Sequence, residues 1–145
     1  MPKALIVFAT HAGETEKIAD LIGEGLRMSG VEAVITNVKT IKSESALAGY
    51  DAYVFGAATY HGDMLETMKT FLFLAKKAEL EGKVGAAFGA YGWSGEAPER
   101  IFGTMKNVFN MDMVKGPLML KSSTLGGGIR MAHDYGREIA QKLNS

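Results

Sequence analysis

Short apolar runs alternate along the whole chain with segments whose apolar residues recur about every 3.6 positions. The runs cover residues 4–8, 31–35, 52–56, 84–90 and 118–120, with a further candidate at 113–115. The segment 38–50 has the weakest helical pattern and predicts one short helix over 43–47. This alternation predicts the α/β class, with five strands and five helices in a mostly parallel sheet that helices cover on both faces.

The residues of the runs predict the order of the strands. The runs at 4–8, 53–55 and 84–88 are apolar at every position, as strands buried on both faces require. Gly116-Pro117 precedes the last run, and proline lacks the N–H that a central strand needs, so this strand belongs at an edge. A central first strand and a fifth strand at the edge favour the order 2-1-3-4-5, in which ligands bind beyond the carboxyl ends of the strands.

Composition excludes several classes of function. The chain is expected to form one domain over residues 1–145. The absence of cysteine excludes a disulfide scaffold, a thiolate zinc site and an iron–sulfur cluster. The 16 basic and 16 acidic residues balance, so nucleic-acid binding is not expected. With neither a signal peptide nor an apolar run of roughly 18–20 residues, the protein is expected in the cytoplasm, without membrane insertion.

The loop after the first apolar run has the features of a phosphate site. Residues 10–16 read Thr-His-Ala-Gly-Glu-Thr-Glu and open an amphipathic helix. Hydroxyl and main-chain N–H groups in such a turn meet the positive end of the helix dipole, which favours a bound phosphate. Neither a P-loop Gly-Lys-Ser/Thr nor a G-x-G-x-x-G sequence is present, so ATP and dinucleotides are not the expected ligands. The alternative is an ordinary helix start that Thr10 caps.

Two further loops follow other predicted strands, over residues 57–63 and 89–97, and bring Tyr60, Tyr91 and Trp93. These loops are expected at the same edge of the sheet as the phosphate loop. Trp93 lies beside glycine and serine rather than on a periodic apolar face, which favours a ligand contact over a place in the core. A phosphate site with aromatic side chains nearby predicts a site for flavin mononucleotide (FMN).

The loop sequences resemble those of a known family. Residues 10–15 are similar to the T/S-x-T-G-N-T phosphate loop of short-chain flavodoxins, and residues 16–19 resemble its version in flavodiiron proteins (A-type flavoproteins). Residues 88–96 resemble the third loop of the latter group. The resemblance covers essentially all 145 residues. It implies a flavodoxin-like three-layer sandwich, free-standing and without the metallo-β-lactamase-like diiron domain of flavodiiron proteins.

The resemblance implies that the FMN phosphate is bound by the side chains or main-chain amides of Thr10, His11, Ala12, Gly13, Glu14 and Thr15. Several charge-assisted hydrogen bonds can hold a dianion without Lys or Arg. Two residues depart from the family pattern: Ala12 lacks a hydroxyl, and Glu14 places a carboxylate where asparagine is usual. Glu14 is therefore expected to point to solvent.

The resemblance also implies contacts to the flavin ring. They come from Ala58, Thr59, Tyr60, His61 and Gly62 in the second loop, and from Ala90, Tyr91, Gly92, Trp93 and Gly95 in the third. Tyr60 is expected to cover one ring face, with Trp93 and Tyr91 also against the flavin. A cationic His61 beside the ring would favour the reduced flavin; the alternative is a solvated loop residue.

Other polar residues receive structural assignments. Asp63 is expected to cap the following helix. Residues 126–128, three glycines, are expected to form a flexible helix entry, and His133 on the last helix is expected to face solvent. No catalytic residue and no metal ligand is predicted.

The resemblance implies an electron carrier that binds FMN non-covalently and shuttles electrons between redox partner proteins, as a monomer or weak homodimer. The alternative is an FMN-dependent NAD(P)H:quinone-type reductase, which needs an open pocket over the flavin. A phospho-acceptor signalling module is disfavoured because Ala9-Thr10 and Ala57-Ala58 stand where it needs acidic residues. The acidic pairs Asp63-Glu66 and Glu96-Glu99 lie near the expected flavin edge and could guide a basic partner.

Overall fold

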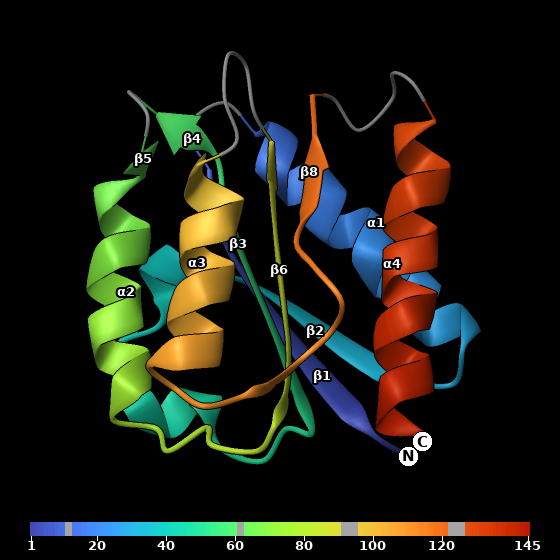
Figure 1. Ribbon diagram of the computed structural model, residues 1–145, viewed down its shortest axis with the longest axis horizontal. Coiled ribbons are helices and arrows are strands. Elements are labelled where there is room, and N and C mark those ends of the chain that lie inside the picture. The colour runs from blue at the N-terminus through green and yellow to red at the C-terminus, as the bar shows by residue number, and fades with distance from the viewer. Residues whose placement is uncertain (11–12, 61–62, 91–95, 122–126) are drawn as a thin grey trace.

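The computed structural model describes residues 1–10, 13–60, 63–90, 96–121 and 127–145 (Figure 1). The strands are β1 (Lys3–Ala9), β2 (Glu32–Asn37), β3 (Ala52–Ala57), β4 (Thr59–Tyr60), β5 (Asp63–Met64), β6 (Val84–Ala90), β7 (Asp112–Met113) and β8 (Leu118–Leu120). The α-helices are α1 (Glu14–Met28), α2 (Glu66–Lys76), α3 (Glu96–Asn107) and α4 (Gly128–Leu143).

The main sheet is parallel and has the predicted order. It runs β2-β1-β3-β6-β7, and β8 also pairs with β6, so β7 and β8 share the fifth position. The predicted edge strand is divided in two around Gly116-Pro117, because proline cannot donate to the ladder. The order 2-1-3-4-5 is therefore confirmed, with an edge strand made of two short pieces.

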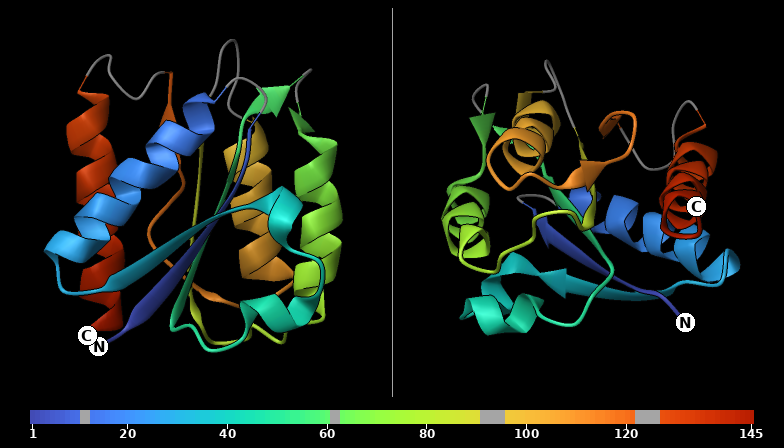
Figure 2. Two further views of the ribbon diagram at one scale, coloured as in Figure 1. Left: turned by 180° about the vertical axis from the view of Figure 1, so that it is seen from behind. Right: turned by 60° about the horizontal axis from the view of Figure 1, so that its bottom comes forward.

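Helices cover both faces of this sheet (Figure 2). In β1 the alternate residues Ala4, Ile6 and Phe8 pack in one core cluster with α1 and α4. The residues between them, Leu5 and Val7, pack in a second cluster with α2 and α3. Because β1 is buried on both faces after its first residue, Lys3, every position from Ala4 to Ala9 is apolar. The three layers of the predicted sandwich follow from that burial.

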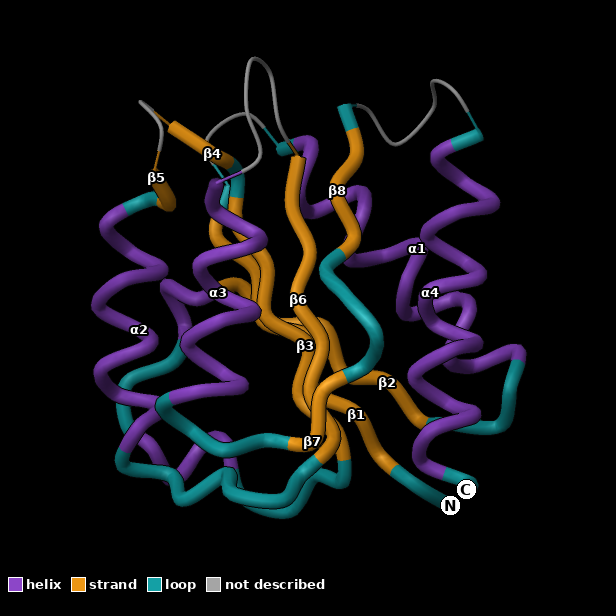
Figure 3. Tube along the Cα trace, in the orientation of Figure 1, coloured by secondary structure: helices purple, strands orange, loops and turns teal. Residues whose placement is uncertain are grey.

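The connection from β2 to β3 differs from the predicted single short helix. It contains two 3₁₀ turns, η1 (Val38–Thr40) and η2 (Glu44–Leu47), which end in the loop before β3 (Figure 3). The Tyr53 hydroxyl on β3 donates a hydrogen bond of 2.5 Å to the Leu47 carbonyl oxygen. This buried contact fixes η2 against the sheet without a regular α-helix.

A small hairpin that the sequence did not predict follows β3. Strands β4 and β5 are antiparallel, with Thr59 opposite Met64 and Tyr60 opposite Asp63. The prediction that Asp63 caps the next helix is wrong, because Asp63 belongs to β5 and the N-cap of α2 is Leu65. The hairpin places the start of α2 beside the sheet edge at which β3 ends.

Candidate functional site

The carboxyl ends of the parallel strands carry the predicted site. Strands β1, β3, β6 and β8 all end at one edge of the molecule, and all four α-helices begin there (Figure 1). Eight predicted site residues lie in the described parts of this edge: Thr10, Gly13, Glu14, Thr15, Ala58, Thr59, Tyr60 and Ala90. The other eight lie outside the described residues: His11, Ala12, His61, Gly62, Tyr91, Gly92, Trp93 and Gly95.

The turn between β1 and α1 is closed by its own hydrogen bonds. The Gly13 N–H donates to the Thr10 hydroxyl oxygen at 2.8 Å, and the Lys17 N–H donates to the Gly13 carbonyl at 3.3 Å. Gly13 is the N-cap of α1 and has a φ of 88°, a left-handed conformation that glycine adopts without strain. The alternative assignment of Thr10 as the helix cap is therefore wrong, and its hydroxyl instead shapes the turn.

Thr15, the second residue of α1, has an unusual environment. The residue is fully buried, and its hydroxyl has no hydrogen-bond partner among the described residues. A buried hydroxyl without a partner costs about 1–3 kcal/mol, so such a group is normally satisfied in the functional state. It lies in the first helical turn, where backbone N–H groups lack intrahelical acceptors and the helix dipole is positive. This donor set fits a phosphate group.

Acidic side chains flank this turn. Glu14 and Glu16 are in the first turn of α1, and Glu14 is partly exposed. The direction of the Glu14 carboxylate, expected toward solvent, stays a prediction. A carboxylate in this position interacts favourably with the helix dipole and leaves the buried side of the turn to Thr15.

The second loop is joined to the start of α3. The Ala97 N–H donates a hydrogen bond of 3.1 Å to the Thr59 hydroxyl oxygen, which ties β4 to the first turn of that helix. Glu96 is the first residue of α3, as its acidic character predicts for a helix entry. The sequence did not show that Thr59 contacts Ala97, because the two residues are far apart along the chain and no periodic pattern connects them.

The ends of β3 and β6 approach each other closely below the third loop. A Cβ atom at Gly89 would overlap the Ala57 carbonyl oxygen and lie 2.7 Å from Cγ of Pro98. The sequence placed Gly89 at the start of the third loop, but it lies inside β6, where a glycine in an apolar strand is a known sign of close backbone approach. Ala90, the last residue of β6, is buried and leads directly into the third loop.

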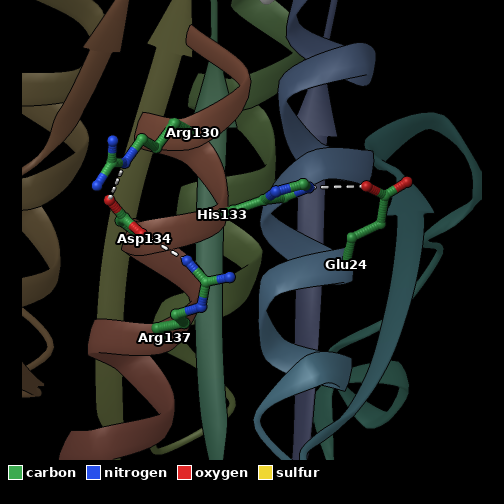
Figure 4. A network of polar contacts seen from close by, with 5 residues as sticks. All are labelled: Glu24, Arg130, His133, Asp134 and Arg137. Carbon is green, nitrogen blue, oxygen red and sulfur yellow. Dashed lines mark hydrogen bonds and ion pairs between the residues drawn. The ribbon is translucent and has the colours of Figure 1, made fainter. Parts of the chain in front are cut away.

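Two assignments on α4 can be compared with the structure. Gly127 is the N-cap of α4 with a φ of 78°, so part of the glycine run does form the helix entry. The prediction that His133 faces solvent is wrong: its Nε2 lies 2.8 Å from Oε1 of Glu24 on α1, and its side chain is only 22% exposed (Figure 4). His133 belongs to the contact between two helices and has no part in the candidate site.

The comparisons with known proteins agree with this geometry. A family model described as a flavodoxin domain matches residues 5–121, most of the chain. The chain belongs to the flavodoxin-domain family. Flavodoxins and flavodiiron flavodoxin-like domains bind FMN, so the predicted cofactor is confirmed at the level of the family.

Individual relatives include both types named by the resemblance. A flavodoxin from Clostridium saccharobutylicum is 33% identical over 87 residues, which are 59% of this chain and 54% of the relative. The type A flavoprotein fprA from Rhodobacter capsulatus is 29% identical over 150 residues, 97% of this chain and 33% of the relative. The chain thus spans only about half and a third of these two relatives.

Solved structures share the flavodoxin-like fold over nearly the whole chain. A flavodoxin from the domain Archaea has a TM-score of 0.91 and 30% identity, and the match covers 99% of each chain. The rubredoxin:oxygen oxidoreductase of Desulfovibrio gigas, at 23% identity and a TM-score of 0.88, has the same fold in 36% of its chain. None of the helices in the described ranges has the length and apolar character needed to cross a membrane.

Proposed function

We propose that residues 1–145 act as one FMN-binding domain that carries electrons between redox partner proteins. The observation that carries this proposal is the buried Thr15 hydroxyl, which lacks a partner among the described residues at the start of α1. Family membership supplies the class of cofactor, and Thr15 supplies a reason, in this chain's own atoms, for a phosphate at this helix.

The residues of the first loop hold the phosphate. The Thr15 hydroxyl and the free N–H groups of the first turn of α1 donate to the phosphate oxygens. The Thr10–Gly13 hydrogen bond fixes the turn before the ligand arrives, which lowers the entropy cost of binding. FMN supplies the electron-transfer chemistry, and the remaining loops orient its ring at the carboxyl edge of the sheet.

A pair of matched threonine variants tests the phosphate site. Thr15 and Thr67 are each the second residue of a helix that begins Glu-Thr at this edge, but Thr15 is buried and Thr67 is exposed. In Thr15→Val the hydrogen bond to a charged phosphate is lost, and FMN affinity should fall by about tenfold or more. Thr67→Val should bind FMN with the same affinity as wild type. Calorimetric titration of each apoprotein with FMN measures both affinities.

Riboflavin separates a phosphate effect from a general disturbance of the pocket. Because riboflavin lacks the phosphate, its affinity should be equal in Thr15→Val and wild-type protein. Equal FMN affinity in the Thr15 and Thr67 variants would contradict the phosphate assignment. Rapid oxidation of NAD(P)H by the isolated protein would favour the reductase alternative over the carrier.

A further inference from the structure

The hydrogen bond between Thr59 and Ala97 joins two segments of the candidate site. Thr59 is the first residue of β4 in the β4–β5 hairpin, and Ala97 is the second residue of α3, after Glu96. The Thr59 hydroxyl oxygen accepts the Ala97 N–H at 3.1 Å across 38 positions of sequence. This bond therefore helps to hold the hairpin and the start of α3 in one relative position.

This bond uses a donor that an α-helix leaves open. The first N–H groups of a helix have no acceptor within the helix, and a residue just before the helix normally caps one of them. In α3 a residue of another element caps the Ala97 N–H, while Ala97 itself is fully buried. A buried N–H without an acceptor is costly, so the hairpin is held where Thr59 can accept this bond.

The side chains and backbone around the Thr59–Ala97 hydrogen bond are closely packed, which leaves the hairpin and the start of α3 little room to move apart. Met64, paired with Thr59 across the hairpin, is buried in the same core cluster as Ala97 and Ile101 of α3. Beneath it, the close contact of Gly89 with Ala57 and Pro98 brings the end of β6 against the start of the same helix. The β4–β5 hairpin, the start of α3 and the ends of β3 and β6 thus pack against one another, and the Thr59–Ala97 hydrogen bond joins the first two of them.

We infer that Thr59 is a positioning residue whose hydroxyl fixes β4 and the first turn of α3 relative to each other, at the side of the candidate site that would receive the FMN ring. This inference rests on the proposed function, because it concerns the same site. A loop held in one position makes the same contacts with little ordering cost, whereas a loose loop must be ordered on binding. Loss of the link should therefore weaken FMN binding, and a midpoint potential should shift where the two redox states of FMN depend unequally on these segments.

Variants that differ in one group test the role of the hydroxyl. Thr59→Val keeps the side-chain shape and the β-propensity but removes the acceptor, whereas Thr59→Ser keeps the acceptor. Thr104→Val is the control, because it also removes a threonine–backbone hydrogen bond, to the Arg100 carbonyl, on the exposed side of α3. Thermal unfolding of each variant checks that the fold is retained.

The first measurement uses the apoprotein and needs no cofactor. Hydrogen exchange of the Ala97 amide, followed by NMR, should be at least tenfold faster in Thr59→Val than in wild type. It should return to the wild-type rate in Thr59→Ser and remain unchanged in Thr104→Val. An unchanged exchange rate of the Ala97 amide in Thr59→Val would overturn the inference, because it would show that the Thr59 hydroxyl does not hold this amide.

The second measurement uses the FMN-loaded protein. In Thr59→Val the FMN dissociation constant should rise at least threefold. One midpoint potential of the bound FMN should also shift, by an amount that corresponds to at least a threefold change in the equilibrium constant of reduction. For one electron, at 59 mV per tenfold, this is about 28 mV. Thr59→Ser should restore both values, and Thr104→Val should change neither.

The outcomes separate the inference from the proposed function. If wild type binds FMN but Thr59→Val keeps its affinity and potentials, the positioning role is overturned and the carrier proposal stands. If Thr59→Ser behaves like Thr59→Val, the hydroxyl is not the responsible group and the inference is again overturned. If wild type does not bind FMN, the proposed function itself fails, whatever the Ala97 exchange rate.

Discussion

The side chain of Tyr135 completes the hydrogen bonding of β6 where the edge strand is interrupted. Strand β7 pairs with Val84 and Gly85, and β8 pairs with β6 only from Phe88 onward. Between them, the Tyr135 hydroxyl accepts the Ala87 N–H at 3.2 Å and lies 2.9 Å from the Ala87 carbonyl oxygen. It is also 2.8 Å from the Gly116 carbonyl oxygen, so one hydroxyl joins β6 to the segment that separates β7 from β8.

Removing this hydroxyl should destabilise the fold. Tyr135→Phe leaves the Ala87 N–H and carbonyl without their partner in a buried position, so the free energy of unfolding should fall by about 1–3 kcal/mol. Tyr50→Phe, at a partly exposed tyrosine, should change it by less than about 0.5 kcal/mol. Urea unfolding of both variants measures the difference, and equal stabilities would contradict the role of Tyr135.

The same residue should affect stability in alkali. Burial raises the pKa of Tyr135 above its ordinary value of 10.0. In the unfolded chain the phenol loses its proton near that value, while in the fold it stays protonated. Its contribution is therefore complete below pH 10 and is lost as pH rises above it. The decline of unfolding free energy above pH 10 should be shallower in Tyr135→Phe than in wild type.

Helices α1 and α4 are close neighbours because glycines form their contact. A Cβ atom at Gly25 would overlap the His133 carbonyl oxygen, and one at Gly136 would lie 2.5 Å from the Ile22 carbonyl oxygen. The His133–Glu24 contact bridges the same pair of helices, while Arg130 and Arg137 both pair with Asp134 along α4 (Figure 4). The glycines set the helix spacing, and the His133–Glu24 contact spans it, whereas the two arginine pairs with Asp134 lie within α4.

Two glycine-to-alanine variants should separate the effect of the α1–α4 contact on stability from the effect of helix propensity. Gly136→Ala forces α1 and α4 apart and should lower the free energy of unfolding by about 1–3 kcal/mol. Gly103→Ala, inside α3 with open space around it, should instead raise that free energy by about 0.5–1 kcal/mol. Thermal and urea unfolding measure both changes, and a stabilising Gly136→Ala would show that the helices do not meet as described.

Elements with their own periodic signal could be predicted from the sequence, and elements made by distant contacts could not. The runs that became β1, β3 and β6 are apolar throughout because both of their faces are buried, and Pro117 showed the edge. The β4–β5 hairpin is too short to show a period, and no local pattern shows that Tyr135 on α4 bonds to Ala87 of β6 where the edge strand is interrupted. The same limit applies to the Thr59–Ala97 link.

Charged residues are sorted between the two ends of α1, α2 and α3, although the net charge of the chain is zero. The helices start at the carboxyl edge of the sheet and run to the opposite edge (Figure 1). Their first turns contain Glu14, Glu16, Glu66, Glu96 and Glu99, and their last turns contain Arg27, Lys76, Lys106 and Lys142. These glutamates form an acidic rim along α1, α2 and α3 at the edge that carries the candidate site, although α4 adds no acidic residue to it and Lys69 pairs with Glu66. A neutral protein can therefore still present a local field to a partner.

This local field predicts how ionic strength changes electron exchange. Reduction of the FMN-loaded protein by a cationic viologen radical should slow severalfold as salt rises from about 10 mM to about 300 mM, because salt screens the acidic rim. Glu99→Gln removes one exposed rim charge and should reduce this salt dependence. Glu81→Gln, an exposed charge between α2 and β6, should not. A protein with no local charge would show no salt dependence. Stopped-flow reduction rates that do not change with salt, or whose salt dependence is equal in the two variants, would therefore contradict the acidic rim.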